Sequence, residues 1–149
     1  VDSLNEDQAN RIRSMYRVAH ELENIGDGCK KIVRWLEKRS RKGYEFHREA
    51  IAELHQFSAH VLDFEKYIDD YLSSSIQKFS LDQARMMEKN LNKQRNALRK
   101  VVRKNLTQGG DVRGEMVFMD IVRHLEQMGD SCYNVAEEIV SIRDVDELD

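Results

Sequence analysis

Apolar residues recur along the chain at alternating spacings of three and four, which is the pattern of helices that pack along one face at shallow angles. Three long segments carry such a seam. The seams are Ile12, Met15, Ala19, Leu22, Gly26, Cys29, Val33 and Leu36; then Ile51, Leu54, Ser58, Val61, Glu65, Ile68 and Leu72; and finally Phe118, Val122, Leu125, Gly129, Cys132, Ala136 and Ile139. A looser seam covers residues 81–101. We expect these seams to form the core.

Turn and capping residues divide the chain into four predicted helices. Gly43 and Gly109-Gly110 mark turns, Ser80 is placed to cap the third helix, and Asp111 is placed to cap the fourth. Short connections make neighbouring helices antiparallel. The prediction is an all-α fold, a long antiparallel bundle of about four helices. Their predicted ranges are 5–39, 44–73, 81–108 and 111–143.

Composition supports one helical domain over residues 1–149. The chain is 40% hydrophobic and 34% charged and has no proline, a mix typical of amphipathic helices and not of disordered or all-β chains. Its two cysteines are too few and too far apart for a disulfide framework, so we expect free thiols in a reducing compartment. No apolar run approaches the roughly 20 residues that span a bilayer. Because the chain starts at Val1 rather than Met, we interpret it as a piece of a larger or processed protein.

An eight-residue block occurs twice. Leu-Glu-Asn-Ile-Gly-Asp-Gly-Cys begins at Leu22, and Leu-Glu-Gln-Met-Gly-Asp-Ser-Cys begins at Leu125, an offset of 103 residues. The same offset relates the first and last seams from Met15 and Phe118 onward. The repeat predicts a duplicated structural unit.

Each block places two carboxylates one helical turn apart beside a glycine. Glu23 and Asp27 lie on the same helix face, where like charges repel, and Gly26 costs about 0.5–1 kcal/mol relative to alanine. A bound cation would explain the acids, and close approach of a neighbouring helix would explain the glycine. The alternative, solvated or ion-paired acids beside a close-packing glycine, stays equally open on the residues alone.

The two blocks resemble the paired E-x-x-G-D motif of PhoU-like proteins, which act in phosphate-uptake control. The motif residues run from Glu23 to Asp27 and from Glu126 to Asp130. Family units have three helices with the motif on the third, so this chain is similar to the last helix of one unit followed by a complete second unit. PhoU-like domains also form the soluble C-terminal part of bacterial sodium/phosphate cotransporters. The resemblance implies a cytoplasmic domain at the inner face of the membrane whose partner is a membrane phosphate transporter, in the same chain or a separate subunit.

The resemblance also implies metal binding, with iron, manganese or magnesium as the candidate ions. The candidate ligands carried over from the motif are Glu23, Asp27, Glu126 and Asp130. The second helix adds Glu65 and Asp69, which have the same acidic spacing but lack the glycine. The stretch 88–95, where family members often carry further acids, is mostly neutral or basic here, so a full multinuclear cluster is not expected.

The third helix is strongly basic. Two interpretations stay open, a solvated helix face and a docking face for anionic lipid headgroups or an acidic partner. The absence of interleaved aromatic residues argues against nucleic acid. The candidate docking residues are Lys93, Arg99, Lys100, Arg103 and Lys104.

Enzyme motifs are absent from the sequence. It has no E-x-x-H or H-E-x-x-H pattern, no phosphate-binding glycine loop and no nucleophile–base arrangement. The leading hypothesis is therefore a regulatory, cation-binding helical domain that controls phosphate transport. The alternative is a metal-free helical adaptor or dimerisation module that acts through protein contacts, and a homodimer is compatible with both.

Overall fold

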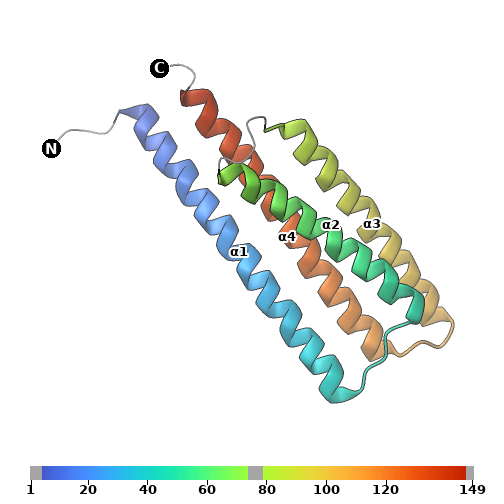
Figure 1. Ribbon diagram of the computed structural model, residues 1–149. Coiled ribbons are helices and arrows are strands. Elements are labelled where there is room, and N and C mark those ends of the chain that lie inside the picture. Colours follow the sequence, from blue (N-terminus) through green and yellow to red (C-terminus); the bar gives the residue numbers. More distant parts are fainter. Residues whose placement is uncertain (1–4, 74–78, 147–149) are drawn as a thin grey trace.

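The computed structural model describes residues 5–73 and 79–146, with side chains through Arg143, and over these residues the chain is an all-α bundle of four long helices (Figure 1). This confirms the predicted fold class, and the observed boundaries lie close to the predicted ones. The helices are α1 (Glu6–Lys42), α2 (Arg48–Leu72), α3 (Leu81–Thr107) and α4 (Val112–Asp146).

Local capping chemistry accounts for where the helices begin and end. Asn5 and Gln8 form a capping box at the start of α1, and α1 ends at Gly43, whose φ of 66° is left-handed. The Ser80 Oγ accepts a hydrogen bond from the Gln83 N–H at 3.3 Å and so caps α3. Asp111 Oδ1 accepts a hydrogen bond from the Arg113 N–H at 3.1 Å at the start of α4. Each of these contacts satisfies a backbone group that the helix itself leaves free.

Helix α4 is the centre of the bundle. It packs against the other three helices, α2 and α3 also pack on each other, and among the described helices α1 packs on α4 alone (Figure 1). The largest fully buried side chains of the bundle include Phe57 and Phe64 of α2, Leu98 of α3 and Phe118 of α4. The predicted seam of the last helix is buried along its whole length, as expected.

Helix α1 runs antiparallel to α4 and packs on it through one face. Val18, Ile25, Ile32 and Trp35 are the half-buried apolar residues of this face. A Cβ atom built on Gly28 would lie 2.7 Å from Met128 Cγ, so the two helices approach closely there.

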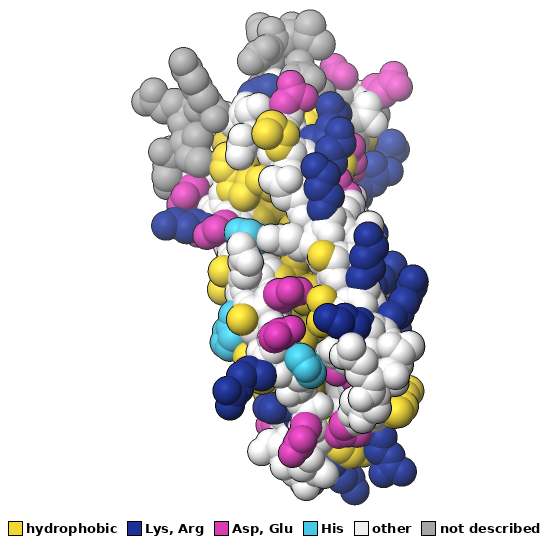
Figure 2. Space-filling model, turned by 90° about the vertical axis from the view of Figure 1, so that its right-hand side faces the viewer, with side chains coloured by type: hydrophobic (Ala, Val, Ile, Leu, Met, Phe, Trp, Pro, Cys, Tyr) yellow, Lys and Arg dark blue, Asp and Glu magenta, His cyan; other side chains and the backbone are white. Residues whose placement is uncertain are grey.

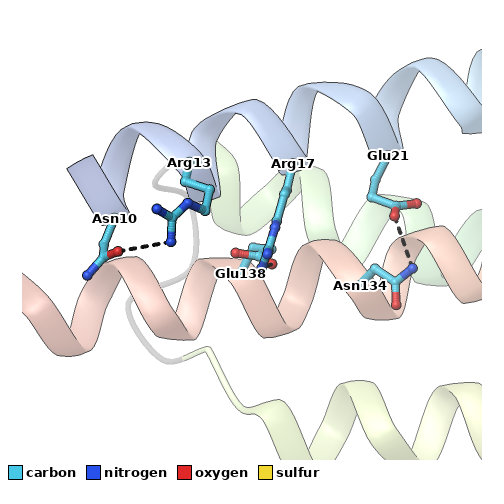
Figure 3. A network of polar contacts seen from close by, with 6 residues as sticks. All are labelled: Asn10, Arg13, Arg17, Glu21, Asn134 and Glu138. Atoms are coloured by element: carbon cyan, nitrogen blue, oxygen red, sulfur yellow. Dashed lines mark hydrogen bonds and ion pairs between the residues drawn. The ribbon is translucent and has the colours of Figure 1, made fainter. Parts of the chain in front are cut away.

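Polar contacts flank the α1–α4 contact, as Figure 3 shows. Arg17 Nη1 lies 2.9 Å from Glu138 Oε1, and Asn134 Nδ2 donates a hydrogen bond to Glu21 Oε1 at 3.1 Å. Exposed pairs of this kind contribute little to stability, so the apolar face carries most of the α1–α4 attachment.

The prediction that the seam of the first helix forms part of the core is wrong. All eight of its residues lie exposed to solvent, among them Cys29, which we expected in the core, whereas the matching Cys132 of α4 is buried. The reason is that α1 is apolar over two adjoining faces and α4 covers only one of them. We call the exposed row the α1 stripe. It consists of Ile12, Met15, Ala19, Leu22, Gly26, Cys29, Val33 and Leu36.

Among the described residues, no helix combines the length and the hydropathy needed to cross a membrane.

Candidate functional site

The first acidic motif lies on the open side of α1. The side chains of Glu23 and Asp27 are exposed, and Glu23 Oε2 lies 3.9 Å from Nδ1 of His20. Apart from the neighbouring residues and backbone of α1 itself, no atom of the described chain lies within 4 Å of the place a Cβ on Gly26 would occupy. The predicted close approach of a helix at this glycine is therefore not made within the described chain.

The second motif lies against α3. Glu126 forms an ion pair with Arg95 Nη1, and Arg99 Nη2 lies 3.9 Å from the other carboxylate oxygen. The side chain of Glu126 is only 15% exposed, so these two cations compensate a carboxylate that has little contact with water. At Gly129 an added Cβ would lie 2.6 Å from Leu91 Cδ1, which confirms the predicted close approach of a neighbouring helix.

Asp130, one turn beyond Glu126, has a raised pKa. Desolvation is the main cause, and the nearby charge of Glu88 adds to it, while Arg95 acts in the opposite direction. Arg95 therefore interacts with two carboxylates, those of Glu126 and Asp130. From the sequence, the stretch 88–95 is only a reason not to expect a full metal cluster. The pattern does not identify Arg95 as the counterion of the motif.

The third acidic pair lies elsewhere, on α2. Glu65 is half-buried, its Oε1 has no hydrogen-bond partner, and burial raises its pKa. Its charge also raises the pKa of Cys29 and of Cys132, although the larger cause is desolvation, which is partial at exposed Cys29 and extensive at buried Cys132. Glu65 thus lies near α1 and α4, whereas Asp69 is exposed one turn further along.

The six predicted ligands are therefore not brought together. In the part of the chain that the structure describes, no three His, Cys, Asp or Glu side chains are grouped so that they could hold a metal ion. A protein cage of several carboxylates is therefore not formed by the described residues, and a cation at one motif would have two carboxylates and water as its ligands. Cation binding at the repeated motifs stays a prediction, and at Glu126 a cation would have to compete with Arg95.

One further buried carboxylate escaped the sequence analysis. Glu115 of α4 is 3% exposed, and its Oε1 accepts a hydrogen bond from Asn105 Nδ2 at 3.1 Å. Its Oε2 has no partner, and burial raises its pKa. Nothing in the spacing distinguishes Glu115 from the surface acids around it, so only the packing of α3 against α4 reveals its position.

The basic residues predicted on α3 do form a solvent-exposed surface. Residues 89–110 contain no aspartate or glutamate, and Figure 2, which views the molecule from the α3 side, shows Lys and Arg side chains along it. Arg99 faces Glu126 at 3.9 Å. Among the described residues, no carboxylate lies within ion-pair distance of the other four. We call the five the α3 basic surface, which consists of Lys93, Arg99, Lys100, Arg103 and Lys104.

The fold is an all-α bundle whose central helix, α4, carries the second copy of the repeated motif. Helices α2 and α3 form a helical hairpin that packs on α4. The chain belongs to the PhoU domain family, whose family model matches residues 58–139, more than half of its length. The match contains Glu126, Gly129 and Asp130 and leaves the first motif outside it. No curated protein and no solved structure matches the chain. Family membership indicates a regulatory role related to phosphate transport and is compatible with a non-catalytic protein.

Proposed function

We propose that this chain is a regulatory domain that controls phosphate transport from the cytoplasmic side of the membrane, by docking on an acidic surface of a membrane phosphate transporter. The transporter is either part of the same polypeptide or a separate subunit. Family membership supports the regulatory role. The α3 basic surface is the single observation that supports docking.

The arrangement of the cations favours a partner over simple solvation. Lys93, Lys100 and Lys104 are spaced seven and four residues apart, which places them on one side of α3, away from buried Leu91 and Leu98. No carboxylate of the described chain neutralises them. An uncompensated row of this length attracts an acidic surface and speeds its association, and salt weakens the attraction.

The test is phosphate uptake in cells that lack the gene and carry either the wild-type or a variant chain. The double variant Lys100→Glu/Lys104→Glu reverses two exposed charges of the surface. We expect labelled phosphate uptake to lose its response to external phosphate, while the helical circular dichroism stays unchanged. The matched control is Arg48→Glu/Lys66→Glu, which reverses two exposed charges on α2 and should keep the response.

A binding experiment separates the transporter from the lipid around it. Purified chain is sedimented with vesicles that contain the transporter and with vesicles of the same anionic phospholipids without it. Binding only to the transporter vesicles, lost in the double variant, is the expected result. Equal binding to both kinds of vesicle, or normal regulation by Lys100→Glu/Lys104→Glu, would overturn the proposal.

A further inference from the structure

A cluster of cations on the C-terminal half of α1 has no counter-charge in the described chain. Together with Trp35, the cations Lys31, Arg34, Lys38 and Arg41 line a hollow of about 310 Å³. Lys38 is half-buried and the other three cations are exposed. Among the described residues, no carboxylate lies within ion-pair distance of any of the four. We call these four cations the α1 basic surface.

Helix geometry places the α1 basic surface on one side of α1. Its steps of three, four and three residues each correspond to about one turn, so the four cations extend over about 15 Å of the helix axis. Cations in the last turn of a helix offset its dipole, but that effect falls off within one turn. Lys31 and Arg34 lie at least two turns before the end of α1 at Lys42, so the dipole does not account for them.

The internal repeat shows that this side of α1 is not a packing face. The positions 103 residues after the first three cations are Asn134, Glu137 and Ser141, and all three are exposed although α2 and α3 pack on α4. A helical hairpin packed in the same way on α1 would leave the matching cations open to solvent. The α4 residues carry no positive charge, so the cations are a feature of α1 rather than of the repeated unit.

Trp35 lies within the cluster and contacts one of its cations. Lys38 Nζ lies 4.6 Å from the centroid of the Trp35 ring. A cation–π contact at a solvated site is weaker than a charge-assisted hydrogen bond to an anion. An anion that enters the hollow should therefore draw the Lys38 ammonium group away from the ring.

The arrangement of the cations favours an anion with several charges along a chain. Arginine binds phosphate oxygens through paired N–H donors, and lysine adds a point charge on a flexible stem. A single phosphate ion can meet the cations of one or two turns. A chain of phosphate groups can meet all four, because the cations follow one another along the helix.

The charge of the same side of α1 changes sign towards its N-terminus. His20 lies eleven residues, or about three turns, before Lys31. The groove at His20 is lined by Glu21, Glu137 and Glu138. These carboxylates repel a long polyanion, or a flat anionic membrane, that lies along the whole helix. The pattern therefore favours a short chain of phosphates over either of these.

We propose that the α1 basic surface binds an oligophosphate, either the free inorganic ion or the phosphate tail of a nucleotide. The four cations hold the phosphate oxygens, and Trp35 forms a wall of the site. This site is separate from the α3 basic surface and does not depend on the proposed function.

Titration of the 149-residue chain with sodium tripolyphosphate, followed by fluorescence and by calorimetry, tests the site. Trp35 is the only tryptophan, so its emission reports on this hollow directly. We expect saturable binding of one tripolyphosphate per chain, with a change in emission as Lys38 leaves the ring. Orthophosphate at the same ionic strength should bind at least tenfold more weakly. A titration that does not saturate, or orthophosphate that binds as tightly as tripolyphosphate, overturns the proposal.

Two charge-neutralising variants separate this site from general attraction by positive charge. Arg34→Gln/Lys38→Gln removes two of the four cations and should weaken tripolyphosphate binding at least tenfold in calorimetry, with unchanged helical circular dichroism. The matched control, Lys100→Gln/Lys104→Gln, removes the same charge from the α3 basic surface and should bind like the wild type. Equal weakening in both variants would mean that net charge alone attracts the anion and would overturn the site.

Adenosine triphosphate, titrated without magnesium, separates the two sources of oligophosphate. Affinity similar to that of tripolyphosphate supports a site that recognises the phosphate chain alone. Tighter binding with stronger quenching of Trp35 supports a nucleotide whose base stacks on the ring. Binding of neither compound overturns the proposal.

Discussion

The two motif glycines hold the same place in the repeat but have different surroundings. Gly26 faces open space, while Gly129 faces the Leu91 side chain. Alanine is the better helix former by about 0.5–1 kcal/mol, so Gly26→Ala should raise the free energy of unfolding of the single chain by that amount. At Gly129 the added methyl overpacks the α3 contact, which costs about 1–3 kcal/mol, so Gly129→Ala should lower it.

Urea denaturation at low protein concentration, where the single chain predominates, measures both glycine variants. Each variant is the control for the other, because both make the same chemical change at the same place in the motif. A stabilisation of equal size in both would show that Leu91 moves aside without cost and would contradict the close contact at Gly129.

The buried carboxylate of Glu115 gives a pH-dependent prediction. Its pKa is raised by burial, so the folded chain holds its proton more tightly than the unfolded chain does. The stability contributed by that proton is present below the ordinary glutamate pKa and is lost as pH rises through the raised value. Glu115→Gln keeps an oxygen for Asn105 and removes the charge, so it should stabilise the chain at neutral pH by roughly 1 kcal/mol.

Denaturation midpoints across mildly acidic to neutral pH test this prediction. The difference between wild type and Glu115→Gln should shrink as pH falls towards the ordinary glutamate value. Glu65→Gln offers a comparison on α2, since burial raises the pKa of Glu65 as well. A Glu115→Gln variant that is less stable than the wild type at neutral pH would mean that the charge is compensated.

At the level of the elements, Asp111 joins the two loops at one end of the bundle. Its Oδ2 accepts a hydrogen bond from the Glu45 N–H at 3.0 Å while its Oδ1 caps α4. The Glu45 contact is the main cause of its lowered pKa. Stability from a lowered carboxylate pKa is present above the ordinary aspartate value and is lost as pH falls through the folded value.

Asp111→Ala should therefore lower the thermal midpoint at neutral pH, and its difference from the wild type should disappear in acid. Asp82→Ala, which removes an exposed acid from the first turn of α3, is the control and should change the midpoint less. A midpoint difference for Asp111→Ala that does not vary with pH would contradict the role of the charged cap.

The contact between α3 and α4 limits cation binding at the second motif. Because Arg95 neutralises Glu126, a divalent cation at Glu126 and Asp130 must displace it. Arg95→Gln should lower the thermal midpoint without added ions, since a mostly buried carboxylate loses its counterion. Added Mn²⁺ or Mg²⁺ should then raise the midpoint more in this variant than in the wild type. Adding Asp130→Ala should remove that gain without unfolding the bundle.

Elemental analysis of the same samples, before and after chelation, shows whether a metal is bound. Arg123→Gln is the control, because Arg123 pairs with Asp120 rather than with an acid of the motif, so its loss should not alter the response to the ions. An equal response in Arg95→Gln and the wild type would rule out competition between Arg95 and a cation at Glu126.

Helix boundaries could be predicted from the sequence because they depend on neighbouring residues. Gly43, Ser80 and Asp111 mark helix ends through backbone hydrogen bonds and local conformation. The surroundings of the motif could not be predicted in the same way. Whether Glu126 meets Arg95, and whether Gly26 meets anything, depends on which helix covers which face. The spacing of apolar residues shows that a face can pack but does not show what packs on it.

At the scale of the whole molecule, α1 is the described helix that buries the fewest apolar side chains, so its attachment is expected to be the weakest. Its fully buried residues are only Ser14 and Gly28, whereas the shorter α2 buries Phe57, Val61, Phe64 and Ile68. Local opening free energies follow the number of buried apolar contacts that an element makes. We therefore expect the amide hydrogens of α1 to exchange with solvent faster than those of α4, with α1 opening while the other three helices remain folded.

Hydrogen exchange at low protein concentration, followed helix by helix, measures this difference. Among the described helices, α1 opens by losing only its contacts with α4, so its amides should exchange with solvent while those of α2 and α3 stay protected. Uniform protection across all four helices at low concentration would contradict the weak attachment, because it would mean that the bundle opens as one cooperative unit.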